Sequence, residues 1–319
     1  LHFEGAITAL LKDALKPNLV QTLENTPVFV HGGPFANIAQ GANSILATKT
    51  ALRLADYAVT EAGFGFDLGA EKFFDIVSRY GEFCTSAVVL VATVRAIKMH
   101  GGAKLKEITT PNPDAVRKGL ENLGKHLENI NKFGMKAVVS INRFITDTDE
   151  ELQLIKDFCE SQGFYAYVVD FWAKGGDGGL ELAQKVIDMI DNKVCIQKFL
   201  YNWSMPIKEK IEIIAKEIYG AEAIDYSALA KQDLKLLKKF NLEHLPICMA
   251  KTQKSLSDNP DLLGRPKDFL VTVREIKLAA GAGFVIPITG EIMRMPGLSK
   301  VPSALNIDVS EDGDITGLF

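Results

Sequence analysis

The sequence SAVVL at residues 86–90, followed by VATVRAIKMHGG at residues 91–102, decides the fold class. The first run is apolar and rich in β-branched residues, which predicts a strand buried on both faces, as in a parallel sheet. Arg95, Lys98 and His100 then appear together beside a Gly-Gly turn. Because ligands of open α/β sheets bind beyond the carboxyl ends of the strands, these side chains indicate an anion site. The spacing supports equally well the alternative that both cations are solvated and that the glycines only turn the chain.

On both sides of this stretch, apolar residues recur with the spacing of a strand in some segments and of a helix in others. Runs typical of strands are followed by turn residues and then by segments with helical spacing, which is the pattern of a doubly wound parallel sheet. Before residue 95 we expect helix 6–15, strand 26–31, helix 38–54, strand 56–62, helix 70–80 and strand 87–94.

A second unit of the same kind follows Pro111, where we place a domain boundary. It comprises a helix from residue 113 to about 133, strand 137–141, helix 149–162, strand 165–170 and helix 180–191. Helices 207–219 and 227–240, a buried strand 246–250 and strands 269–276 and 285–288 come next, with a last segment at 304–309. The whole predicts an α/β protein with doubly wound, mainly parallel sheets in a multi-domain subunit and a small α+β domain at the carboxyl end.

Composition restricts the function. The 319 residues are 47% hydrophobic and 24% charged, which is ordinary for a globular protein with a real core. The formal net charge of −4 gives no electrostatic support to nucleic-acid binding. No apolar run reaches the roughly 18 residues that span a bilayer, so we expect no membrane association.

The cysteines and histidines show no metal-ligand spacing. No CxxC pair and no HExxH occurs, so we expect no metal site. Apolar neighbours surround each cysteine, which predicts small core thiols and a reducing, cytoplasmic location. The cysteines are Cys84, Cys159, Cys195 and Cys248.

The glycine-rich loop at residues 63–69 carries aromatic side chains where a loop is normally polar. Phe64 and Phe66 between glycines can form a stacking wall for a flat ligand, although burial in the core is commoner for either one alone. Glu61 and Asp67 flank this loop as potential metal or substrate ligands, although isolated acids are usually only solvated.

Two further aromatic residues follow neighbouring predicted strands. Phe144 comes just after strand 137–141, and Trp172 just after strand 165–170. Parallel neighbouring strands bring such loops side by side at the carboxyl edge of the sheet. A planar heterocycle can then lie between the two rings. Core packing is the default for each ring singly, but the pair, beside Arg143 and Lys174, favours a ligand site.

Several catalytic motifs are absent from the sequence. The phosphate-binding pattern GxxxxGK(S/T) does not occur, no GxGxxG opens a helix after a strand, and GxSxG is missing. Leu1 is not an initiator methionine, and residues 1–5 resemble no signal or transit peptide, so we expect the chain to begin inside a longer protein.

Long motifs along nearly the whole chain resemble the formate–tetrahydrofolate ligase (10-formyltetrahydrofolate synthetase) family, of the bacterial monofunctional type. The motifs are VATVRAIKMHGG (91–102), TPVFVHGGPFANIA (26–39), TEAGFGFDLGAEKF (60–73), ICMAKT (247–252), MPGL (295–298), KVPSALNIDV (300–309) and GLF (317–319).

The resemblance implies an enzyme of one-carbon metabolism that joins formate to tetrahydrofolate with ATP and Mg²⁺. Formyl phosphate is the intermediate, and 10-formyltetrahydrofolate, ADP and phosphate are the products. It also implies a cytoplasmic homotetramer supported by a monovalent cation, K⁺ or NH₄⁺. By the same resemblance, Phe144 and Trp172 hold the folate ring and Phe64 borders the pocket. The implied domains are the end of a large P-loop-type α/β domain (1–110), a Rossmann-like α/β domain with the folate-stacking aromatics (111–250) and a small α+β domain (251–319).

One departure from the family concerns catalysis. The family's ATP-binding loop, with its lysine, and the arginine that holds formyl phosphate precede the position of Leu1. We therefore expect the catalytic residues upstream, with Arg95 and Lys98 as contributors, and no activity from this chain alone. The alternative is a non-catalytic pterin-binding or scaffolding piece. A stand-alone nucleotide-binding protein is disfavoured because the phosphate loop is missing.

Overall fold

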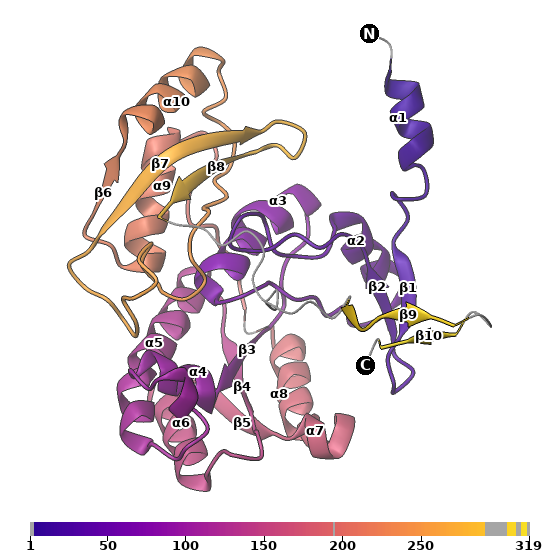
Figure 1. Ribbon diagram of the computed structural model, residues 1–319, viewed down its shortest axis with the longest axis vertical. Helices are drawn as coiled ribbons and strands as arrows, with labels where there is room; N and C mark the ends of the chain where they lie inside the picture. Colours follow the sequence, from indigo (N-terminus) through magenta and orange to yellow (C-terminus); the bar gives the residue numbers. More distant parts are fainter. Residues whose placement is uncertain (1–2, 194, 291–304, 311–313, 318–319) are drawn as a thin grey trace.

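The computed structural model describes residues 3–193, 195–290, 305–310 and 314–317 (Figure 1). A parallel sheet with its helices occupies the lower part of Figure 1, and a mixed sheet with two helices occupies the upper left. This arrangement confirms the α/β class. Among the described residues, no helix is long and apolar enough to cross a membrane. The motif at 295–298, the first half of 300–309 and residues 318–319 of the last motif lie outside the described residues.

The parallel sheet has the strand order β3 (Val88–Thr93), β4 (Ala137–Asn142) and β5 (Tyr165–Val169). Strand β4 is central, and all its residues except Asn142 are buried. Strand β3 alternates instead, with 43% of Val89 and 60% of Val91 exposed. The prediction that residues 86–90 are buried on both faces is therefore wrong for β3, because Val89 and Val91 are exposed on the same face of this strand. Among the described strands β3 lies at the edge of the sheet.

Helices cover both faces of this sheet (Figure 1). They are α4 (Val94–His100), η3 (Leu105–Glu107), α5 (Pro113–Lys132), α6 (Asp149–Ser161), α7 (Phe171–Lys174), η4 (Gly175–Gly179) and α8 (Leu180–Asp191). Local capping explains the boundaries of the long helices. The Asn112 side chain accepts the Ala115 N–H ahead of α5, and Thr148 and Glu151 form a capping box on α6. The segment 171–179, expected as a loop, forms two short helices.

The first 81 residues depart most from expectation. Their elements are α1 (Glu4–Leu11), β1 (Asn18–Gln21), β2 (Pro27–Val30), α2 (Ile45–Leu54), the π-helices η1 (Phe66–Ala70) and η2 (Phe73–Val77), and α3 (Ser78–Gly81). Strand β2 pairs antiparallel with β1, so it is part of a hairpin. Helix α2 begins at Ile45 because Ser44 caps it. The predicted strand 56–62 is wrong, since these residues form a single bridge, between Ala42 and Ala62, within the part of the chain that the structure describes.

The remaining elements follow α8. They are α9 (Ile207–Ile213), η5 (Ile214–Tyr219), β6 (Ala223–Tyr226), α10 (Ala228–Lys239), β7 (Leu270–Ala279), β8 (Phe284–Thr289), β9 (Asp308–Val309) and β10 (Ile315–Thr316). Strand β6, absent from the prediction, pairs parallel with β7, and β7 pairs antiparallel with β8. The predicted strand 246–250 is buried but forms only isolated bridges, from Ile247 to Val285 and from Ala250 to Ile288.

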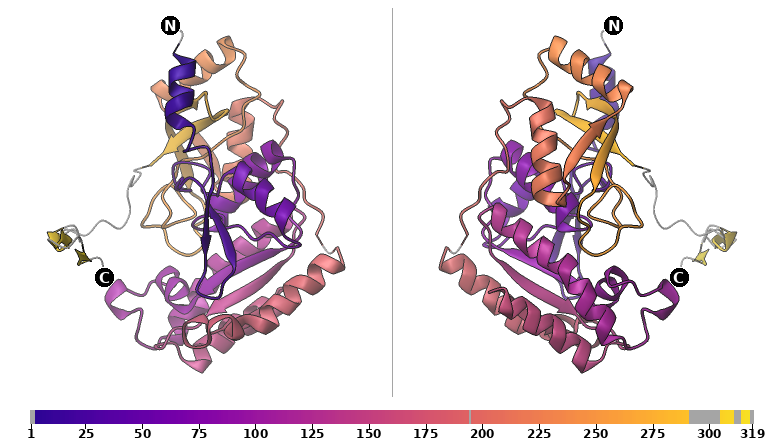
Figure 2. Two further views of the ribbon diagram at one scale, coloured as in Figure 1. Left: turned by 90° about the vertical axis from the view of Figure 1, so that its right-hand side faces the viewer. Right: turned by 90° about the vertical axis from the view of Figure 1, so that its left-hand side faces the viewer.

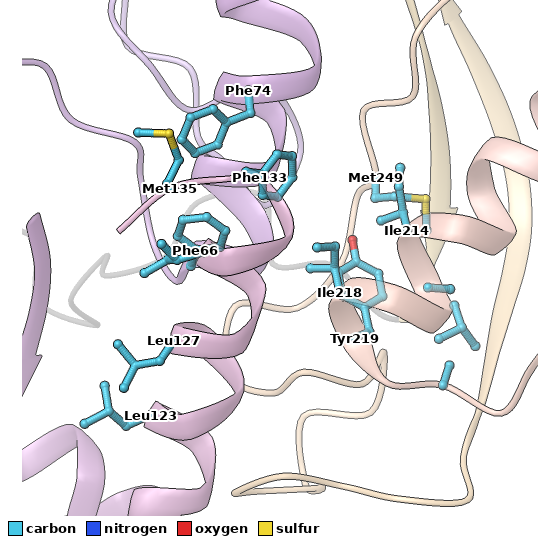
Figure 3. Close-up of a cluster of buried hydrophobic side chains, with 14 of the residues drawn as sticks. Phe66, Phe74, Leu123, Leu127, Phe133, Met135, Ile214, Ile218, Tyr219 and Met249 are labelled. Carbon is cyan, nitrogen blue, oxygen red and sulfur yellow. The ribbon is translucent and has the colours of Figure 1, made fainter. Parts of the chain in front are cut away.

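One apolar core joins these parts. It includes Phe66 and Phe133, whose ring centroids lie 5.8 Å apart, and extends through Tyr219 and Met249 to Val285 (Figure 3). Backbone pairing of β3 with β4 crosses the division predicted near residue 111. The three-part division of the chain stays a prediction.

The cysteines divide into two kinds. Cys159 and Cys248 are buried, as expected, and burial raises the pKa of their thiols to about 12 and about 11. Cys84 is exposed and Cys195 half-buried, so the expectation of a core thiol is wrong for Cys84.

Candidate functional site

The loops that carry Phe144 and Trp172 begin side by side. Asn142 and Val169, the last residues of β4 and β5, are register partners, and the Arg143 N–H donates to the Val169 carbonyl at 3.0 Å. The structure therefore brings these two loops together at the carboxyl edge of the sheet, as the parallel topology requires.

Phe144 is 38% exposed, and Arg95 covers its ring. The Arg95 guanidinium carbon lies 4.2 Å from the ring centroid, a cation–π distance, and Nη2 of the same group lies 3.3 Å from Thr146 Oγ1. The Phe144 N–H donates to Asp147 Oδ2 at 2.9 Å. Burial raises the pKa of Asp147, although this N–H and the charges of Lys98 and Arg95 oppose the shift. Phe144 is thus fixed by its backbone and by a planar cation.

Trp172 lies on the one-turn helix α7 and is 96% exposed. The Asp170 side chain accepts the Ala173 N–H at 3.2 Å and so caps the start of this helix. A nearly fully exposed indole is uncommon and leaves both ring faces open to a ligand.

Phe64 and Phe66 have opposite environments. Phe64 is 45% exposed and has a φ of 59°, which is rare for a residue with a side chain. Phe66 is buried against Phe133 and Phe74, so the core alternative holds for Phe66 alone. Within the described ranges no ring contact joins Phe64, Phe144 and Trp172. The assignment of these three residues to a ligand site therefore stays a prediction.

The cationic residues predicted to form an anion site after β3 are not all free to bind an anion. Lys98 is fully buried, and its ammonium lies 3.0 Å from the Glu151 carboxylate and donates to the Thr110 carbonyl at 3.0 Å. Burial, with the charges of His126 and Lys251, lowers the pKa of His100 to about 4. His100 Nδ1 accepts the Gly264 N–H at 3.2 Å, so the ring is a neutral acceptor at pH 7. The structure does not assemble the expected three-residue anion site, and catalytic roles for Arg95 and Lys98 stay predictions.

A buried ion pair joins Asp67 to Lys251 at 3.0 Å. The Lys251 ammonium also donates to the carbonyls of Thr252 and Ser255 and lies 5.0 Å from the centre of the Tyr219 ring. Burial opposes ionisation of Asp67, but the charges of Lys251 and His126 outweigh it and lower the pKa of Asp67. Burial also lowers the pKa of Lys251. Asp67 thus has a protein partner and is not the free ligand that its place beside the loop suggested.

Two further buried acids were not singled out from the sequence. Glu71 and Asp75 are one helical turn apart, and both are fully buried. Burial raises the pKa of Asp75 to about 7, and burial with the neighbouring Asp75 charge raises the pKa of Glu71 well above its usual value. The Leu200 N–H donates to Asp75 Oδ1 at 2.9 Å. An acidic residue within the apolar run FFDIV (residues 73–77), with a second acid four positions earlier, is the signal that identifies such a pair.

Among the side chains that the structure describes, no group of three histidine, cysteine or acidic residues is arranged to hold a metal ion. Two carboxylates in the loops of the predicted stacking residues each have a protein donor: Asp147 receives the Phe144 N–H, and Asp170 receives the Ala173 N–H. These residues do not fit a site for Mg²⁺.

Comparison with known proteins identifies a matching family and many curated relatives. The family model described as "Formate--tetrahydrofolate ligase" matches residues 1–319. The curated protein named formate–tetrahydrofolate ligase from Syntrophus aciditrophicus (strain SB) is 57% identical over 318 residues. That alignment covers 100% of this chain and 56% of the Syntrophus protein, so the chain spans about half the length of its curated relative.

Proposed function

Because this chain belongs to the formate–tetrahydrofolate ligase family, we propose that it carries the tetrahydrofolate-binding part of an enzyme that joins formate to tetrahydrofolate. The observation that carries the proposal is the pairing at the ends of β4 and β5. It starts the loops of Phe144 and Trp172 side by side, with Trp172 96% exposed.

Binding in this proposal depends on stacking. The pterin ring of tetrahydrofolate is planar and is stabilised against exposed aromatic faces. Trp172 supplies an open face, and Phe144 supplies a ring whose orientation is supported by Arg95. Phe64 borders the same pocket. These residues bind and orient the folate amine, while activation of formate needs groups that hold phosphate.

We propose ATP with Mg²⁺, formate and tetrahydrofolate as the ligands of the complete enzyme, with formyl phosphate as intermediate. We also propose K⁺ or NH₄⁺ as an activator, a homotetramer and a cytoplasmic location. The family resemblance supports all of these. Since the 319 residues contain no GxxxxGK(S/T) pattern and the described acids do not fit Mg²⁺, no step is assigned here to ATP.

The binding proposal is tested by tetrahydrofolate titration followed by tryptophan fluorescence. The chain has two tryptophans. Trp203 is partly buried and donates to the Asp75 carbonyl at 3.1 Å, so it is the background signal. We expect saturable quenching in the wild type. Trp172→Ala should lose this quenching, and Phe240→Ala, which removes a 64% exposed ring just after the distant α10, should keep it. Absence of quenching in the folded wild-type chain would contradict the proposal.

A turnover assay tests the second part of the proposal, that this chain alone is inactive. We expect no ATP- and formate-dependent 10-formyltetrahydrofolate from this chain alone, and turnover once a family piece with the phosphate-binding loop is added. Folate binding without restored turnover would favour the alternative function, a non-catalytic pterin-binding or scaffolding unit.

A further inference from the structure

The tip of the β1–β2 hairpin contacts the glycine-rich turn after α7. Glu24, in this tip, accepts the Gly176 N–H through Oε1 at 2.6 Å, across 152 positions of sequence. Figure 1 shows the hairpin pointing down toward α7, and Figure 2 shows the same approach from the side. The contact therefore links the amino-terminal hairpin to the loop that carries Trp172.

The turn has a shape that accepts this carboxylate. A Cβ atom at Gly175 would lie 2.5 Å from Glu24 Oε1, and one at Gly176 would lie 2.5 Å from Oε2. Gly175 also has a φ of +57°, which favours glycine. The carboxylate lies directly on the backbone of two residues that leave room for it only because they lack side chains.

This turn holds the helix that presents Trp172. Helix α7 is four residues long, and its last N–H to carbonyl bond runs from Gly175 to Phe171. The Asp170 N–H donates to the Gly178 carbonyl at 3.3 Å, which closes the segment 170–178 on itself. Because Trp172 is 96% exposed, packing does not hold its ring. The orientation of the indole depends on the backbone of α7, and Glu24 contacts that backbone at its carboxyl end.

At its base the hairpin is held by Asn43, whose Nδ2 donates to the Phe29 carbonyl at 2.8 Å and whose Oδ1 accepts the His31 N–H at 3.1 Å, but its tip has little apolar support. All residues of β1 are exposed, and Leu23 beside Glu24 is completely exposed. A hairpin with so little buried apolar surface contributes little to the core. Its directional contact with the turn is the Glu24 hydrogen bond, which is strengthened by the carboxylate charge.

We propose that Glu24 is a positioning residue of the tetrahydrofolate site, which fixes the α7 backbone so that Trp172 faces the pterin ring. This inference rests on the proposed function. Glu24 contacts no ligand in this scheme and acts through Gly176.

The test uses the full 319-residue chain carrying Trp203→Phe, so that Trp172 is the single tryptophan. Without ligand, Glu24→Ala should lower the fluorescence anisotropy of Trp172 and increase its quenching by acrylamide. With tetrahydrofolate, Glu24→Ala should weaken binding by about 3- to 10-fold, as expected for loss of one charge-assisted hydrogen bond. Glu24→Gln should restore much of the affinity, because its amide oxygen can accept the same N–H.

Two variants separate positioning from folding. Leu23→Ala alters the same hairpin tip without the carboxylate and should match the parent in both measurements. Glu24→Asp keeps the charge but shortens the side chain by one methylene, so it should show the same lower anisotropy and weaker binding as expected for Glu24→Ala. It keeps the inference testable if Glu24→Ala does not fold. Parent-like anisotropy and affinity in Glu24→Asp would overturn the inference. If the parent itself does not bind tetrahydrofolate, the proposed function fails, and the ligand-free anisotropy still decides the role of Glu24.

Discussion

The Lys251 ammonium and the Asp67 carboxylate form an ion pair at 3.0 Å in which Lys251 is fully buried and Asp67 is 7% exposed. The pair connects the helical segment 66–81 with the bridged segment 247–250, which precedes Lys251. Its ends lie in the first and third of the predicted domains. Replacing one residue of the pair by an uncharged one leaves the other charge buried and uncompensated. Such a substitution tests directly how much the ion pair contributes to stability.

Lys251→Met should lower the free energy of unfolding by about 3–5 kcal/mol, because the Asp67 carboxylate loses its partner inside the protein. Urea denaturation at pH 7 measures the change. Lys16→Met is the matched control, since Lys16 pairs with Asp13 at 2.8 Å at the surface, with side chains 66% and 89% exposed. That variant should change stability by less than about 1 kcal/mol. Equal losses in the two variants would refute the structural role of the buried pair.

Asp75→Asn should change the pH dependence of stability. The folded-state pKa of Asp75 is raised from 3.8 to about 7, so the folded protein binds a proton more tightly than the unfolded chain between these values. Wild-type stability therefore falls as the pH rises through this window. Asparagine removes that loss, and its Oδ1 can still accept the Leu200 N–H.

The measurement for Asp75→Asn is urea denaturation at about pH 4.5 and about pH 8. Relative to wild type, the variant should gain on the order of 3 kcal/mol between the two values. A stability difference that is independent of pH would show that Asp75 ionises normally in the folded protein. Asp13→Asn, at an 89% exposed side chain, is the control and should show no such gain.

Substitution of glycine by alanine should have opposite effects on stability at two positions of α5. A Cβ at Gly119 would lie 1.9 Å from the Ile97 carbonyl oxygen, which is backbone of the neighbouring α4 and cannot yield easily. A Cβ at Gly124 would lie 3.1 Å from the Phe158 ring edge, which can shift. We expect Gly119→Ala to destabilise by about 2 kcal/mol or more. Gly124→Ala should be neutral or stabilising by up to about 1 kcal/mol, from helix propensity. Thermal unfolding of both variants compares them directly, and a stable Gly119→Ala would exclude close α4–α5 packing.

Arg95→Lys should weaken tetrahydrofolate binding by about 3- to 10-fold while leaving the net charge unchanged. Lysine lacks the planar group that lies 4.2 Å from the Phe144 ring centroid and within 3.3 Å of Thr146 Oγ1. Fluorescence titration measures the affinity. Arg117→Lys keeps a surface pair with Asp114 on α5 and should bind as the wild type does. If both variants bind equally well, the Arg95–Phe144 contact does not support the site.

The position of the two candidate loops could be predicted from the sequence because strand order and loop position follow from local patterns. The placement of Phe144 and Trp172 after β4 and β5 required only the two strands and their parallel pairing. The contacts of Arg95 with Phe144, and of Glu24 with Gly176, could not be predicted. Each joins residues far apart in the chain, and no periodicity or capping signal reports such a pair.

The sequence by itself determined the βαβα order from β3 to α8, because caps such as Asn112 and Thr148 act on their own helix within three residues. The same rules predicted a strand at 56–62, an anion site that includes Lys98, and Asp67 as a potential metal or substrate ligand. Only the tertiary structure decided these points. Among the described residues, 56–62 have no strand partner beyond the Ala42–Ala62 bridge. In the interior, Lys98 pairs with Glu151 and Asp67 pairs with Lys251. A strand needs a neighbour for its backbone groups, and a buried charge needs a counter-ion, so both depend on residues that local sequence does not contain.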